Sequence, residues 1–268
     1  MNAALFKTMF KANAKSIFSY AFGTMLYLWL VIWIYPSMAD TKGIQDIMKQ
    51  MPEGMLKAFN VSASFNSLGA FIANEFYGLL FIIILAIFSI VTGTKLIARL
   101  VDRGSMAYLL STPNSRVKIA ITQMTQLITG LVLIILFAIG GGLLGVAIFI
   151  NQPDLHVARY IQMNVIGLLL FFVISGYTFF FSCLFNDEKR ALSCSTTVTL
   201  LFYILNMVGK MSDGLAWMKH ISIFSLYQPQ DIIYGSAHVM AISAGLFVGG
   251  AFLYVIAILT FRSRDLPL

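Results

Sequence analysis

The residues able to do chemistry are few in this chain of 268 residues, and their spacing fits no catalytic or metal-binding pattern. Cys183 and Cys194 lie in apolar stretches, and they form no metal-ligand spacing with the three histidines. The sequence has no H-E-x-x-H, no G-x-S-x-G and no G-x-x-x-x-G-K-[ST] motif. We therefore expect no catalytic residue, no metal site and no cofactor on this chain, so a partner must supply any driving energy. The histidines are His156, His220 and His238.

The composition is that of a membrane protein. Hydrophobic residues make up 59% of the chain and charged residues only 11%, with a mean hydropathy of +0.85. A soluble domain of this size carries about 25% charged residues, and so few charges could not cover its surface. Ten-residue strands of alternating hydrophobicity are absent, which favours a helical bundle over a barrel.

Six segments are long and apolar enough to cross a bilayer as helices, which takes about 20 residues. None of the six contains Asp, Glu, Lys, Arg or His, which argues against a proton relay or an ion pathway. We predict an all-α integral membrane protein in which residues 1–268 form a single transmembrane domain. The predicted spans are Ile17–Tyr35, Phe76–Thr94, Leu127–Ile150, Val165–Phe185, Leu192–Val208 and Val239–Phe261.

The charges predict the orientation of these spans. With the N-terminus inside, 12 of the 18 Lys and Arg residues but only 4 of the 11 acidic residues fall in cytoplasmic segments. Basic residues gather on the cytoplasmic side of membrane proteins, so both termini are expected to be cytoplasmic. The same rule explains the net charge of +7 without a nucleic-acid partner, and none is expected.

The segment before the first span is basic and amphipathic. Lys7, Lys11 and Lys15 recur every four residues and therefore share one helical face. One interpretation is a helix lying in the membrane surface, with its lysines toward anionic lipid headgroups. The alternative is that the first span begins early and extends its lysines to the surface.

The loop between the second and third spans, Lys95–Lys118, carries five basic residues and a single acid. Gly104 interrupts its helical spacing, and Pro113 ends an element because the residue before a proline avoids the α region. Asn114 or Ser115 is then placed to cap the third span. We predict a short amphipathic helix with a turn at each end, against the alternative of a basic stop-transfer loop.

The stretch Asp102–Arg116 resembles the signature of type-2 ABC exporter permeases. That signature is an acidic-basic-Gly-Ser/Thr stretch, a Leu pair, a Ser/Thr-Pro turn and Ser-Arg. The chain departs from it at Ala107, where the family often has an acid, and at Asn114. The resemblance implies a coupling helix that seats in a groove of a cytoplasmic ATPase. The residues implied at that contact are Asp102, Arg103, Gly104, Ser105, Tyr108, Leu109, Leu110, Pro113 and Arg116.

The resemblance also implies an external segment that dips into the membrane between the last two spans. Trp217–Ser236 is too apolar for a free loop, and Pro229 breaks it. With Phe224 and Tyr227, Pro229 is expected to form an external gate. An interfacial helix with a belt of aromatic residues is the alternative.

Two further features bear on assembly. Gly141–Gly145 and Gly245–Gly249 are G-x-x-x-G pairs, which permit close helix packing either within the chain or between two chains. The resemblance implies two permease chains, most simply a homodimer, and two ATPase chains that bind ATP and Mg²⁺.

The sequence therefore predicts the permease subunit of an ATP-driven exporter in the bacterial plasma membrane. The uncharged spans suit a hydrophobic or amphipathic substrate, such as a peptide or a drug. An ion-coupled or facilitative carrier and a non-transporting membrane scaffold are the two alternatives from other classes.

Overall fold

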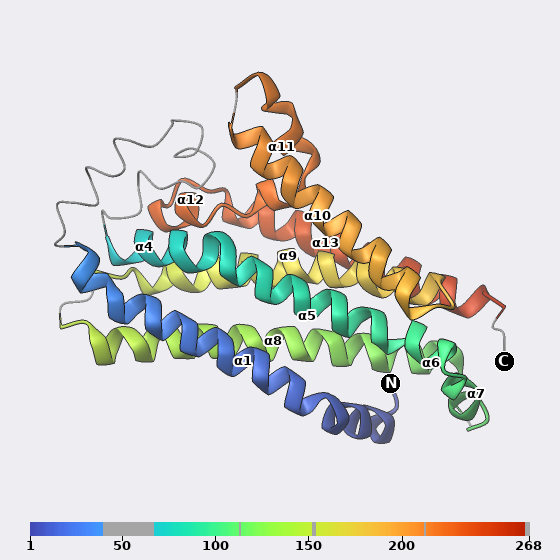
Figure 1. Cartoon of the computed structure of the whole chain (residues 1–268). Helices are drawn as coiled ribbons and strands as arrows, with labels where there is room; N and C mark the ends of the chain where they lie inside the picture. The colour runs from blue at the N-terminus through green and yellow to red at the C-terminus, as the bar shows by residue number, and fades with distance from the viewer. Residues whose placement is uncertain (40–66, 113, 152–153, 212, 266–268) are drawn as a thin grey trace.

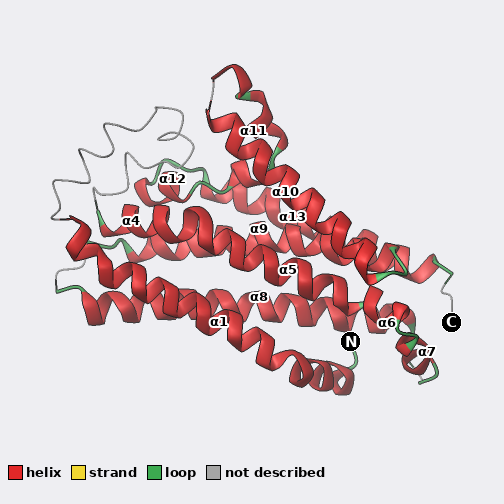
Figure 2. Ribbon diagram, in the orientation of Figure 1, coloured by secondary structure: helices red, strands yellow, loops and turns green. Residues whose placement is uncertain are grey.

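The structure is a computed structural model that describes residues 1–39, 67–112, 114–151, 154–211 and 213–265. Helices joined by short loops make up this part of the chain, without strands (Figure 2). The elements are α1 (Ala3–Ala39), α4 (Leu68–Glu75), the π-helical turn η2 (Phe76–Leu80), α5 (Phe81–Leu96), α6 (Ala98–Asp102), α7 (Ser105–Leu110), α8 (Arg116–Phe149), α9 (Val157–Leu184), α10 (Glu188–Met211), the 3₁₀ turn η3 (Asp213–Leu215), α11 (Trp217–Ile221), the 3₁₀ turn η4 (Ile223–Leu226), α12 (Pro229–Tyr234) and α13 (Val239–Ser263).

All six predicted spans are confirmed as helices long and apolar enough to cross a membrane. The first and third helices begin well before the predicted spans, α1 at Ala3 rather than Ile17 and α8 at Arg116 rather than Leu127. The Ser115 hydroxyl accepts a hydrogen bond from the Lys118 amide at 3.3 Å and so caps α8, as one of the two predicted caps. The first turns of α8 are polar, which is why an apolar window misses them.

The N-terminal segment is helical but not separate from the first span, because α1 is continuous. By length and composition α1 is one candidate span from Ala3 to Met38, and the position of its first turns relative to the membrane surface stays a prediction. Figure 1 shows the first turns of α1 bent away from the rest of the helix. In the first turns of α1, the Met9 carbonyl oxygen accepts from the Asn13 and Gln126 side-chain amides, at 3.0 and 3.2 Å. Side-chain donors inserted at a helical carbonyl are a recognised cause of helix bending.

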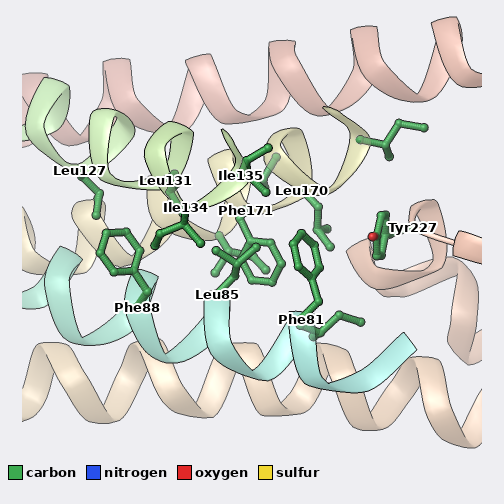
Figure 3. Close-up of a cluster of buried hydrophobic side chains, with 14 of the residues drawn as sticks. Phe81, Leu85, Phe88, Leu127, Leu131, Ile134, Ile135, Leu170, Phe171 and Tyr227 are labelled. Carbon is green, nitrogen blue, oxygen red and sulfur yellow. The ribbon is translucent and has the colours of Figure 1, made fainter. Parts of the chain in front are cut away.

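The centre of the bundle is α9. Buried residues make up 67% of its most apolar stretch, against 22% in α10 and in α13. It packs against α5, α8, α10 and α13, while α1 packs mainly against α8. Figure 3 shows the apolar core between α5, α8 and α9, with Tyr227 at its edge. The labelled core residues are Phe81, Leu85, Phe88, Leu127, Leu131, Ile134, Ile135, Leu170, Phe171 and Tyr227.

The two glycine pairs differ in environment. A methyl group at Gly141 would meet Met25, and one at Gly145 would meet Trp29, so this pair serves packing of α8 against α1. The Trp29 indole also donates to the Gly141 carbonyl oxygen at 2.6 Å. Among the described residues, a methyl group at Gly245 or Gly249 would meet nothing within 4 Å, so these residues leave that face of α13 open.

The ends of the bundle carry different structures (Figure 1). The start of α1, the end of α13, the α6–α7 pair and the α9–α10 connection lie at one end, which we call the termini end. The segments α11 and α12 lie toward the opposite end, which we call the far end. An even number of spans requires this placement of the termini.

Candidate functional site

The predicted coupling loop folds as two short helices at the termini end. The helix is interrupted at Ile97, between α5 and α6. Gly104 separates α6 from α7 and has a left-handed φ of 69°. Glycine adopts this conformation without the steric cost that a side chain would bring. The predicted break at Gly104 is confirmed, and so is the end before Pro113, because α7 stops at Leu110. Pro113 itself lies outside the described residues.

The pair α6–α7 has a buried base and an exposed tip. Met106 is fully buried, whereas the Tyr108 side chain is 79% exposed. Asp102, Arg103 and Gly104 are also exposed, and Ser105, Leu109 and Leu110 are half-buried. An aromatic ring held in the open beside charged residues is typical of a protein-binding surface. The described coupling residues from Asp102 to Leu110 therefore lie together on one projecting feature.

The start of α10 anchors α6. Asp102 Oδ2 accepts a hydrogen bond from the Glu188 amide at 3.4 Å, and Arg99 Nε lies 3.6 Å from Glu188 Oε2. Both side chains of the ion pair are partly exposed, so its contribution to stability is small. Asp187 caps α10 by accepting from the Arg190 amide at 3.0 Å, and this bond lowers the pKa of the Asp187 carboxyl. Asp102 thus has an internal partner as well as an exposed position.

Arg116 lies apart from the exposed tip, because its guanidinium faces the end of α13. Its Nη1 donates to the Arg264 carbonyl oxygen at 2.5 Å. The Arg264 guanidinium in turn donates to the Cys183 carbonyl oxygen at 2.6 Å, near the end of α9. The two arginines therefore connect the start of α8 to the end of α13, and the end of α13 to the end of α9.

Ser182 of α9 is a functional candidate that sequence reasoning missed. Its fully buried hydroxyl accepts from the amides of Ile97 and Ala98, at 3.2 and 2.9 Å, and donates to the Thr94 carbonyl oxygen at 2.9 Å. These three backbone groups belong to the break between α5 and α6. The sequence carries no signal of this, since Ser182 is one small residue in an apolar span far along the chain.

The three lysines of the predicted surface helix, Lys7, Lys11 and Lys15, are exposed in the first turns of α1. Ile17 on the other side of α1 is buried, and Gln126 of α8 bonds to the Met9 carbonyl oxygen. The segment is therefore amphipathic in the folded chain, as the spacing predicts.

The predicted external gate is packed into the far end of the bundle. Phe224 and Tyr227 are almost fully buried, and Pro229 is buried at the start of α12. The Tyr227 ring stacks on Phe81 of α5 with centroids 6.2 Å apart. By contrast, α11 carries Trp217 with 56% of its surface exposed. The segment therefore divides into an exposed α11 and a buried η4–α12 portion.

Three side-chain hydrogen bonds hold η4–α12 in place. Gln230 donates to the Ala70 carbonyl oxygen of α4 at 2.8 Å, and Arg159 of α9 donates to the Ile233 carbonyl oxygen at 2.8 Å. The Ser222 hydroxyl donates to the Phe202 carbonyl oxygen of α10 at 2.6 Å. Because each bond reaches a different helix, movement of those helices would displace the segment.

A buried tyrosine pair lies beside this segment and was also missed from the sequence. The Tyr160 hydroxyl donates to the Ala138 carbonyl oxygen at 2.7 Å. The Tyr77 hydroxyl, in the π-helical turn η2, lies 3.0 Å from both the Tyr160 hydroxyl and Asn164 Oδ1, with one proton to donate. π-helical turns inside α-helices are frequent at functional sites. Isolated tyrosines in apolar spans give no sign of such pairing.

These features define a class: a helical membrane protein with six candidate spans, with the projecting pair α6–α7 at the termini end and the buried segment η4–α12 at the far end. A family model described as ABC-2 family transporter protein matches residues 22–260. The chain therefore belongs to the ABC-2 transporter family, whose members are membrane subunits of transporters and associate with an ABC ATPase. The resemblance noted on Asp102–Arg116 is confirmed. The chain matches no curated protein.

Proposed function

We propose that this chain is the permease subunit of an ATP-driven exporter, with residues 1–268 forming one transmembrane domain. The observation that carries the proposal is the α6–α7 pair, which projects at the termini end with Tyr108 exposed. In an ABC-2 family member, an exposed aromatic tip on a buried base is the surface best suited to an ATPase groove. The excess of basic residues supports a cytoplasmic position for this end.

The proposed transporter contains two copies of this chain and two copies of an ATPase, which binds ATP and Mg²⁺. Closure of the ATPase pair pushes on α6–α7 and rocks the spans, so that substrate leaves past η4–α12. The Gly245–Gly249 face of α13 supports a homodimer, because in the described part of the chain nothing lies within 4 Å of a methyl group placed at either glycine. Lys7, Lys11 and Lys15 are placed to contact anionic lipid headgroups of a bacterial plasma membrane.

The proposed substrate is hydrophobic or amphipathic, such as a peptide or a drug. The predicted spans contain no Asp, Glu, Lys, Arg or His. The buried polar groups of η2 and α9 include neutral hydroxyls and amides, among them Tyr77, Tyr160 and Asn164. Such a path lacks the charged groups that would compensate a small ion for its lost hydration.

The test is gentle-detergent purification of the tagged chain from its native membranes, followed by mass measurement of the intact complex. We expect two copies of this chain with two copies of an ATPase. Tyr108→Ala should weaken capture of the ATPase about thirtyfold, because truncating an anchoring aromatic typically costs 2 kcal/mol or more.

Trp217→Ala is the matched control, since Trp217 is an exposed aromatic side chain at the far end. It should leave ATPase capture unchanged. Recovery of the wild-type chain alone would contradict the proposal. In that case, substrate movement in reconstituted vesicles without any ATPase would favour the carrier, and its absence would favour the scaffold.

A further inference from the structure

Two helices, α9 and α10, contact both candidate sites, and α9 is the more buried of the two. At the termini end, its Ser182 hydroxyl bonds to the break between α5 and α6. At the far end, its Arg159 guanidinium bonds to the Ile233 carbonyl oxygen of α12. A methyl group at Gly167 of α9 would overlap Phe81 and come into van der Waals contact with Tyr227, so the helix backbone also lies close to a gate residue.

The break at Ile97 separates the coupling helices from α5. Ile97 has φ −121° and ψ −56°, so α5 and α6 do not form one continuous helix. A rigid helix passes on a displacement along its axis, whereas an interrupted helix can bend at the break. A push on α6–α7 would therefore not travel along α5 unless another element held the break.

Ser182 of α9 fixes the interruption between α5 and α6 through its hydrogen bonds. Its hydroxyl completes all of its hydrogen-bonding capacity within the break, as the acceptor for two amides and the donor to one carbonyl oxygen. The site is fully buried, so water cannot replace the hydroxyl, and its removal would leave the Ile97 and Ala98 amides without a partner.

The contact has support on both sides of Ser182. One turn earlier on α9, the Thr178 hydroxyl lies 3.3 Å from the Ser89 carbonyl oxygen of α5, and Thr178 fills the space above Gly93. One residue later, the Cys183 carbonyl oxygen accepts from Arg264 at the end of α13. Thus α6 is fixed to the least exposed helix of the bundle.

We propose that Ser182 is a positioning residue that makes α6 and α9 move together, so that α9 carries the ATPase stroke from the coupling helices to the η4–α12 gate. This inference rests on the proposed function, since it assumes that an ATPase acts on α6–α7. Ser182 and Arg159 are the attachments of α9 at its two ends.

The test uses hydrogen–deuterium exchange of the full complex in nanodiscs, with and without trapping by ATP and vanadate. In the wild type, trapping should change exchange in peptides covering residues 223–234. Ser182→Ala should raise exchange at Ile97 and Ala98 about tenfold. It should also abolish the response of residues 223–234 while the complex still hydrolyses ATP.

Ser182→Thr, which keeps the hydroxyl, should restore the response at residues 223–234. Ser182→Cys, with a weaker hydrogen-bonding group, should give a partial loss and serves if the alanine variant does not fold. Ser195→Ala is the matched control, because Ser195 is equally buried but its hydroxyl donates to Ala191 within its own helix α10. It should change neither measurement.

A trapping response at residues 223–234 that survives in Ser182→Ala would overturn the inference, and so would a wild-type complex without that response. Failure of the proposed function is a separate result, namely a chain that binds no ATPase. In that case, hydrogen–deuterium exchange at Ile97 and Ala98 in the isolated chain would still test the role of Ser182. If exchange at these amides is the same in Ser182→Ala as in the wild type, Ser182 is not a positioning residue.

Discussion

Gly142 shows how tightly single residues are fitted between α8 and α9. The Tyr160 hydroxyl lies directly over this glycine and donates to the Ala138 carbonyl oxygen one turn earlier. A methyl group at Gly142 would overlap that hydroxyl, whereas one at Gly140 would meet nothing within 4 Å. Neighbouring glycines of one helix thus have opposite tolerance for a side chain.

Gly142→Ala should destabilise the protein by about 2 kcal/mol, because an added methyl group in a packed interior displaces its neighbours and here also the Tyr160 hydrogen bond. Thermal unfolding of the purified protein in one detergent measures the effect. Gly140→Ala should unfold no earlier than the wild type. Equal unfolding temperatures for the two variants would show that the overlap with Tyr160 is relieved at no cost.

At the scale of elements, the sequence predicts features that depend on neighbouring residues, but it does not predict contacts between distant residues. The turn at Gly104, the end before Pro113 and the cap at Ser115 each depend on the chemistry of one or two neighbouring residues, and the sequence predicts them. Ser182 and Tyr77 act through partners more than 80 residues away. A single sequence gives no information about which distant residues meet.

The contact of Arg116 with α13 is not predicted from the sequence for the same reason. Its place in the Ser-Arg sequence indicates a coupling residue, but its guanidinium binds the end of α13, 148 residues along the chain. Its effect on coupling remains a prediction. The continuous α1 was not settled either, because nothing in the basic segment before Ile17 marks whether the helix stops there.

Gly104→Ala tests how the orientation of α7 depends on its junction with α6. The surroundings of Gly104 are open, so the cost comes from its positive φ alone, at about 1 kcal/mol. Relief of this strain should turn α7 and reduce ATPase capture several-fold. Gly104→Asn should have a milder effect, since asparagine tolerates the left-handed region. Unchanged capture by Gly104→Ala would indicate that the ATPase does not depend on the angle between α6 and α7.

For the whole molecule, the six spans and their class follow from composition because the bilayer admits few backbone structures. The arrangement of the spans does not follow, since lipid-facing and protein-facing positions are both apolar. The central place of α9 and the open faces of α10 and α13 are visible only in the folded chain. The placement of the termini end in the cytoplasm rests on the charges.

Cysteine labelling of intact cells with a membrane-impermeant maleimide tests this orientation. Ile221→Cys, at an α11 position that is 53% exposed, should be labelled from outside. Tyr108→Cys should be labelled only after the cells are permeabilised. The native cysteines serve as the background, because Cys183 is buried and Cys194 lies within α10. The opposite labelling pattern would place α6–α7 outside the cell and remove the ATPase contact.

The hydroxyl at the α5–α6 break also sets an order of events during biosynthesis. Ser182 emerges from the ribosome 85 residues after Ile97. At about 5 to 20 residues per second, the interval is about 4 to 17 seconds. During that time the second and third spans can already enter the membrane, yet the amides of Ile97 and Ala98 lack their final partner. The hydrogen bonds that fix the start of α6 to α9 can therefore form only after the fourth span has been made.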